Sequence, residues 1–183
     1  IRALTDEYTD DSGAIFTVAE VGGDEAEAEM KAFTQGEAHL NSAYGFNFLY
    51  ADRLTPGLVC AALAEWPDDP GTGWPSWAFE NHDAPRAVSR WCPAGCSPEQ
   101  VAAFARMKMA LLASLRGNII IYQGEELGLE QDDIPFEKLH DPEAIANWPL
   151  TLSRDGVRTP MPWVAHDPRG GFSTGSPWLP VGE

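Results

Sequence analysis

The stretch that decides the fold is residues 79–86, Phe79-Glu80-Asn81-His82-Asp83-Ala84-Pro85-Arg86. An apolar run typical of a buried strand leads into it, and an imidazole and a carboxylate lie next to each other where that run ends. Pro85 excludes a helix at this point. The pair suits the binding of a polar ligand at the carboxyl end of a strand, as at the mouth of a barrel. An Asx-type turn is the alternative, and the rest of the chain must decide.

Composition and charge limit the class of protein. With 183 residues, 44% of them hydrophobic, the chain can bury a core, so disorder is excluded. A net charge of −16 argues against nucleic acid and anionic membranes as partners and suits a neutral or cationic small molecule. No run has the apolar length of a membrane span.

The three cysteines are too few and too unevenly placed for a disulfide framework. Cys92 and Cys96 are close enough in sequence to pair, but reduced loop thiols are the preferred interpretation. We therefore expect a cytoplasmic protein. A periplasmic location stays open, because Ile1 is not an initiator Met and the sequence is silent about a leader.

Helical and strand-like patterns alternate along the first two thirds of the chain. Apolar runs predict strands at 15–19, 44–50, 77–79 and 118–122. Helical spacing, caps and stops predict helices at 1–8, 25–34, 55–65 and 97–115, with a Pro/Gly-rich loop before the third strand. Strands separated by helices predict βα units with a parallel sheet over residues 1–122. Residues 123–183 are rich in Pro, Gly and Trp, which is typical of a functional loop excursion.

Polar groups follow three of the four predicted strands. They are Glu20, the His82–Asp83 pair, and the segment Gln123-Gly124-Glu125-Glu126. Because the carboxyl ends of parallel strands share one edge of a sheet, these groups should converge there and form a carboxylate site. For a single strand-end acid, a helix cap or a salt bridge would be the better interpretation.

Four ordered segments resemble the α-amylase superfamily, family 13 of the glycoside hydrolases. Residues 79–86 resemble its fourth signature region, and Thr17-Val18-Ala19-Glu20-Val21-Gly22-Gly23 resembles its third. Residues 120–128 are similar to the end of the eighth barrel strand, and Arg154-Asp155-Gly156-Val157-Arg158-Thr159-Pro160-Met161-Pro162-Trp163 is typical of the α-glucosidase and oligo-1,6-glucosidase branch. The resemblance implies an α/β fold, a (β/α)8 TIM barrel represented by about strands 5–8.

The resemblance also implies roles for five residues. Glu20 would be the general acid/base, with a pKa raised by burial and nearby negative charge. Asp83 would bind sugar hydroxyls and stabilise the oxocarbenium-like transition state, and His82 would hold a hydroxyl of the same ring. Arg154 and Arg158 match the two arginines that this branch places around the non-reducing-end glucose. Their fixed donors suit hydroxyls and carboxylates.

The family's nucleophile is missing from this sequence. No Asp before Glu20 has the Asp-x-x-x-Arg-x-Asp setting that the family uses at the end of the fourth strand. A full barrel takes roughly 250 residues, so we expect the second half of a catalytic domain, inactive alone and lacking its N-terminal half as a partner. Without those neighbouring strands the chain should be marginally stable or prone to aggregation.

Other motifs are weaker. Gly171-Phe172-Ser173-Thr174-Gly175 fits a serine-hydrolase pattern but lacks the strand and helix that such an elbow requires. The histidines and cysteines lack metal-ligand spacing and no nucleotide fingerprint is present, so we predict no metal within this chain and no cofactor. The functions that remain are a retaining α-glucosidase, a glucosyl transferase or isomerase on the same scaffold (of the sucrose isomerase, trehalose synthase or amylosucrase type), and a non-catalytic relative. The retained Glu20, His82 and Asp83 argue against the last.

Overall fold

The computed structural model describes residues 1–11, 13–66, 73–171 and 173–182. Residues 67–72, where the sequence predicts a Pro/Gly-rich loop, and Phe172 of the Gly-x-Ser-x-Gly pattern lie outside the described residues. The chain forms two compact units. One contains residues 1–78 and 112–120, and the other contains residues 79–111 and 121–183.

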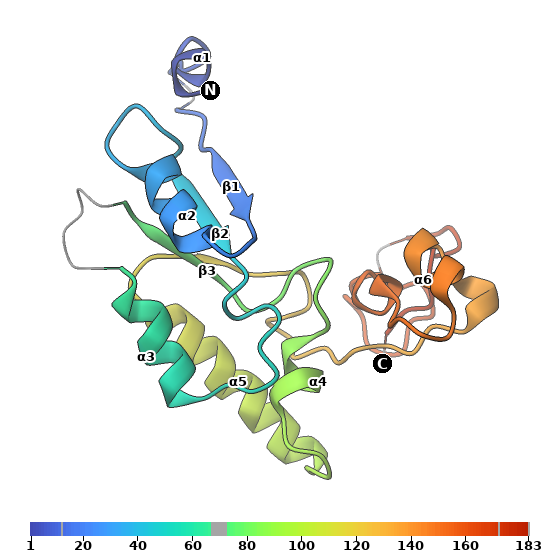
Figure 1. The fold of residues 1–183 in the computed structure, drawn as a ribbon. Coiled ribbons are helices and arrows are strands. Elements are labelled where there is room, and N and C mark those ends of the chain that lie inside the picture. Colours follow the sequence, from blue (N-terminus) through green and yellow to red (C-terminus); the bar gives the residue numbers. More distant parts are fainter. Residues whose placement is uncertain (12, 67–72, 172, 183) are drawn as a thin grey trace. The chain divides into compact units, whose positions relative to one another are not determined.

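The first unit is built on a parallel sheet (Figure 1). Its strands are β1 (Val18–Val21), β2 (Ser42–Gly45), β3 (Pro75–Ala78) and β4 (Asn118–Ile120), and they lie in the order β1-β2-β3-β4. Every neighbouring pair is parallel. Because sequence neighbours are also sheet neighbours, each connection is a βα-type crossover, and the predicted parallel sheet is confirmed.

The strands are shorter than predicted at two places. The run 44–50 was predicted as one strand, but β2 ends at Gly45. Beyond it the chain turns, with Phe48 and Leu49 packed into the core and Phe48 edge-to-face on Trp77 at 5.8 Å. The run 118–122 also ends early, at Ile120.

The prediction of a buried first strand was wrong. Ile15 and Phe16 precede β1, and they and Val18 are exposed. The physical reason is that β1 is the first strand in the sheet order and pairs only with β2 within the described part of the chain. An apolar β-branched run therefore identifies the strand but not its burial.

Among its described residues, the first unit also contains α1 (Arg2–Asp6), α2 (Ala26–Thr34) and α3 (Pro56–Ala64). Helix α2 packs on β1 and β2. Helix α3 begins as predicted, with Pro56 in the first turn and the Thr55 hydroxyl accepting a hydrogen bond from Leu58 N. Helix α1 is shorter than the predicted 1–8, because the chain turns after Asp6.

Gly117 ends helix α5 (Pro98–Ser114) and leads into β4 with a φ of 137°. A Cβ atom there would lie 2.6 Å from the Pro75 carbonyl oxygen, so a glycine is required on both counts. At the other end of α5 the predicted capping box is present. Gln100 Oε1 accepts from Ser97 N at 2.8 Å and Ser97 Oγ accepts from Gln100 N at 3.4 Å.

The second unit carries little regular structure beyond α5, which passes into the first unit at Leu112. It contains α4 (Ala87–Trp91), α6 (Pro142–Asn147) and the short 3-10 helices η2 (Phe136–Lys138) and η3 (Arg154–Val157). Ile134, Leu139, Ala144 and Leu179 form a small core among these loops. Within the described part of residues 123–183, regular structure is limited to α6 and these two 3-10 helices.

Candidate active site

The second unit gathers four of the five predicted site residues, and Asp83 lies at their centre. Asp83 Oδ1 accepts a hydrogen bond from Arg158 Nη2 at 2.7 Å and from Arg154 Nη1 at 3.4 Å. His82 Nε2 lies 3.5 Å from Asp83 Oδ2. Asp83 and both arginines keep about a third of their side-chain surface exposed, so the group faces solvent on one side. Two segments more than 70 residues apart are thus brought together.

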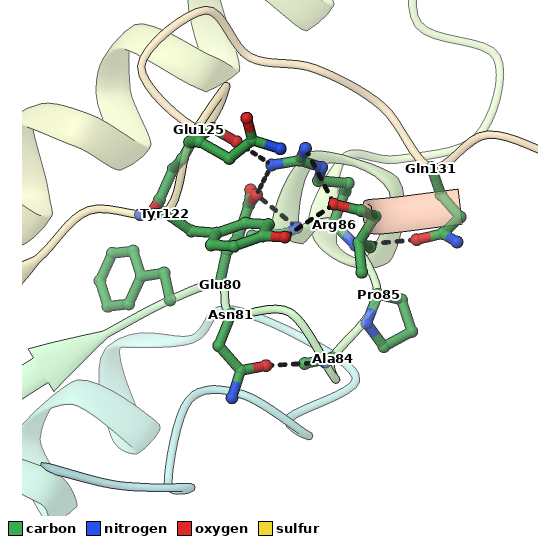
Figure 2. A network of polar contacts seen from close by, with 12 residues as sticks. Glu80, Asn81, Ala84, Pro85, Arg86, Tyr122, Glu125 and Gln131 are labelled. Atoms are coloured by element: carbon green, nitrogen blue, oxygen red, sulfur yellow. Dashed lines mark hydrogen bonds and ion pairs between the residues drawn. The ribbon is translucent and has the colours of Figure 1, made fainter. Parts of the chain in front are cut away.

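The loop that presents Asp83 is an Asx-type turn. Asn81 Oδ1 accepts from Asp83 N at 2.9 Å and from Ala84 N at 2.8 Å, as Figure 2 shows for the second contact. Arg158 Nε also donates to the His82 carbonyl at 2.9 Å. The Asx-type turn, which the sequence posed as the alternative to a polar binding site, is present, and the same loop presents Asp83 to the two arginines.

Asp141 is a site residue that the sequence analysis missed. Its two carboxylate oxygens accept from Arg154 Nη2 at 2.7 Å and from Arg154 Nε at 3.0 Å, a bidentate arrangement. These charge-assisted bonds hold the pKa of the nearly buried Asp141 well below its usual range and raise that of Arg154. Asp141 thus fixes the guanidinium that approaches Asp83.

A second carboxylate that the sequence did not single out, that of Asp155, holds the segment around η3. Asp155 Oδ2 accepts from His140 N at 2.6 Å and from Asp141 N at 2.8 Å, and the side chain is buried. The Asp141–Pro142 pair reads as a helix cap and first helical residue, and Asp141 Oδ1 indeed accepts from Glu143 N at 3.2 Å. This helix-start pattern could have singled out Asp141, but nothing in the sequence predicts that Arg154 is its partner.

Glu20 lies in the first unit, on β1, in register with Tyr44 of β2. The expectation of a buried Glu20 is not met, since its side chain is exposed. The reason is that β1 is the first strand in the sheet order, and the same position exposes Val18.

The described residues contain no group of three or more His, Cys, Asp or Glu side chains placed to hold a metal ion. Cys60, Cys92 and Cys96 are free thiols. None of the described helices is both long and apolar enough to cross a membrane.

The cluster around Asp83 can form hydrogen bonds, through its arginines and carboxylates, to a polar, uncharged ligand.

A family model described as the alpha-amylase catalytic domain matches residues 1–183. The chain belongs to the alpha-amylase family. The parallel sheet is accordingly part of that family's (β/α)8 barrel, and the order of strands β1 to β4 agrees with a section of such a barrel.

Members of the alpha-amylase family resemble the chain over nearly its whole length. A probable alpha-glucosidase of Rhizobium meliloti (strain 1021) is 42% identical over 183 residues, which is 100% of this chain and 32% of the relative. An oligo-1,6-glucosidase of Heyndrickxia coagulans is 31% identical, and the match covers 90% of this chain and 35% of the relative.

The solved structure of an alpha-glucosyl transfer enzyme is also similar. It is 41% identical, with a TM-score of 0.80 over 99% of this chain and 32% of that one. The chain therefore spans about a third of the length of the relatives that it matches.

Proposed function

We propose that this chain supplies the acid/base and sugar-binding side of a retaining α-glucosidase. The substrate would be the non-reducing-end glucose of a short oligosaccharide or of a sucrose- or maltose-like α-glucoside. The observation that carries the proposal is the convergence of Arg154 and Arg158 on Asp83 Oδ1. A fixed array of guanidinium donors around one carboxylate suits the hydroxyls of a single sugar ring.

Each residue then has a chemical task. Glu20 protonates the glycosidic oxygen and later removes a proton from the water that releases the sugar. Asp83 accepts hydrogen bonds from ring hydroxyls and stabilises the positive charge of the oxocarbenium-like transition state, and His82 holds a hydroxyl beside it. The nucleophile is expected in the part of the relatives that this chain does not span, at about 5–5.5 Å from the acid/base, as retention requires.

Glucosyl transfer is the second candidate, and one observation favours it. The 41% identical structure is described as an alpha-glucosyl transfer enzyme. In transfer, a second sugar takes the place of water and attacks the glucosyl-enzyme. Glu20 then removes the proton from the attacking hydroxyl of that sugar. Product analysis with maltose and with sucrose separates the two, because hydrolysis gives only free monosaccharides whereas transfer or isomerisation gives new disaccharides or longer products.

The decisive experiment is Glu20→Gln in the full-length protein, assayed on maltose. Loss of a general acid/base lowers kcat by about 100- to 10,000-fold. Glu29→Gln, which changes an exposed carboxylate of the same type on α2, is the matched control and should leave kcat within about twofold. Near wild-type activity of Glu20→Gln would overturn the proposed role.

We also propose that the protein acts in the cytoplasm, because its three cysteines are free thiols and a reducing compartment keeps thiols reduced.

A further inference from the structure

The second unit also contains a group of buried charges that the proposed mechanism does not use. We call it the buried charge network: Glu80, Arg86, Lys108 and Glu125. Each of these side chains is at most 1% exposed. Two cations and two carboxylates give a balanced charge, which is the condition under which such groups are tolerated away from water.

Glu80 is the centre of the network. Its Oε1 accepts from Lys108 Nζ at 2.9 Å and from Ala87 N at 3.0 Å, and its Oε2 accepts from Arg86 Nη1 at 3.0 Å. Lys108 Nζ donates in addition to Glu125 Oε1 at 3.1 Å. Burial raises the pKa of the Glu125 carboxyl, which Lys108 counters. Glu125, one of the strand-end acids that the sequence predicts for the carboxylate site, is thus fully buried against Lys108 and is not presented to a ligand.

Arg86 differs from the other three because it bonds to the surrounding loops. Its Nη1 also donates to the Gln123 carbonyl at 2.7 Å, and its Nη2 donates to the Val157 carbonyl at 3.4 Å. Its backbone N donates to Gln131 Oε1 at 3.2 Å, and its guanidinium stacks on the Tyr122 ring at 4.9 Å, as Figure 2 shows. One side chain therefore connects the segments that begin at Phe79, at Tyr122 and at η3.

The connection to η3 is reinforced by neighbours of Arg86. Tyr122 Oη donates to the Val157 carbonyl at 3.0 Å, and Gln123 Nε2 donates to the Thr159 carbonyl at 3.1 Å. Val157 and Thr159 flank Arg158, whose guanidinium meets Asp83. Asp83 itself lies three residues before Arg86 in the same loop. Arg86 thus belongs to the loop that carries Asp83 and is hydrogen-bonded to Val157, the residue before Arg158.

From this placement we infer that Arg86 is a positioning residue. It fixes the loop that carries Asp83 against the segment that carries Arg154 and Arg158, and so it sets the geometry of the sugar-binding cluster without touching the substrate. The role rests on the proposed function for its effect on catalysis. The physical contribution is the fork of the guanidinium, which reaches Glu80, Gln123 and Val157 at once, whereas a lysine offers one compact ammonium group.

Two variants of the full-length protein separate positioning from charge balance. Arg86→Lys keeps the buried charge but loses the fork. The double variant Lys108→Met/Glu125→Gln removes one buried charge of each sign and leaves every contact of Arg86 in place. Folding of each variant is checked by near-UV circular dichroism and by thermal unfolding, and kcat and KM are measured on maltose well below the unfolding midpoint.

We expect Arg86→Lys to fold and to lose about 100-fold in kcat, because misplacement of a binding group by about 1 Å costs on that order. KM should change far less, since Asp83 acts mainly in the transition state. The double variant should unfold at a lower temperature but keep kcat within about threefold of wild type. If Arg86→Lys keeps wild-type kcat while folded, or if both variants lose kcat in proportion to stability, Arg86 only balances charge and the inference fails.

Hydrogen exchange supplies a readout that does not depend on activity. In Arg86→Lys, the amides of residues 154–159 and 81–84 should exchange faster, while those in the middle of α5 keep their protection. If the wild-type protein cleaves no α-glucoside, the proposed function fails, and this exchange pattern still tests the connection. Unchanged exchange at 154–159 would overturn the positioning role by itself.

Discussion

Asp141→Asn is the substitution whose effect can be worked out most fully from the structure. It keeps the shape of the side chain but turns one of the two oxygens that face Arg154 into a donor. Only one of the two bidentate contacts, at 2.7 or 3.0 Å, can then be kept by the remaining carbonyl oxygen, and it loses its charge assistance, while the contact of Arg154 to Asp83 is the longer one at 3.4 Å. A donor facing a guanidinium repels it, so the cluster around Asp83 loses its anchor.

The magnitude follows from burial. Breaking a fully buried ion pair costs about 3–5 kcal/mol, and an exposed pair contributes at most about 1 kcal/mol. Asp141 is 2% exposed but Arg154 is 31% exposed, which places the cost between these limits, at about 2–3 kcal/mol. For a slope of about 2 kcal/mol/M, the urea midpoint falls by about 1 M. The matched control is Glu143→Gln, an exposed change two residues away, which should shift stability by less than about 0.5 kcal/mol.

The pH dependence gives a second test with a fixed sign. The pKa of Asp141 is lower in the folded protein than in the unfolded chain. Its contribution to stability is therefore complete above the unfolded pKa, about 3.9, and is lost as the pH falls toward the folded value. The difference in unfolding free energy between wild type and Asp141→Asn should be constant from pH 6 to 8 and smaller by about 0.7 kcal/mol at pH 3.5. An equal urea midpoint for both proteins at pH 7, or a difference that grows in acid, would refute the reasoning.

Two further predictions concern the same unit of the full-length protein. Gly156→Ala places a Cβ against Gln131 Nε2 and the Asp132 carbonyl, so it should cost about 1–3 kcal/mol of stability and lower kcat/KM by displacing Arg154 and Arg158; an unchanged kcat/KM on maltose would contradict this. Ser97→Ala removes the capping hydroxyl of α5 and should lower the stability measured by thermal unfolding by about 0.5–1 kcal/mol, while kcat stays the same. A loss of kcat would contradict this, because it would show that the cap is coupled to the site.

The sequence was sufficient for the order of the helices and strands, and it singled out Asp83, Arg154 and Arg158 but not Asp141. The segments that carry Glu20 and His82–Asp83 were recognisable because short apolar runs lead into them, although Glu20 lies within β1 and not after it. The caps at Thr55 and Ser97 were found because the residue types and spacing of a cap are local.

Burial and long-range pairing were not accessible in the same way. The exposure of Val18 depends on the position of β1 in the sheet, which no local pattern encodes. The Asp141–Arg154 pair joins two loop residues 13 positions apart, where no periodicity fixes which side chains meet. Lys108 was detectable in principle, since it lies on the same helical stripe as the buried Ala105 and Leu112, where a cation requires a buried partner.

The cluster around Asp83 pairs two carboxylates, Asp83 and Asp141, with two guanidinium groups, Arg154 and Arg158. In a chain of net charge −16 it is locally neutral. Removal of any one member leaves a charge whose partner is gone, in a place where water reaches only part of the group. Variation at these four positions should therefore arise in charge-matched pairs rather than singly. A directed-evolution library that varies them one at a time would sample mostly weakened proteins and miss the altered specificities that paired changes can reach.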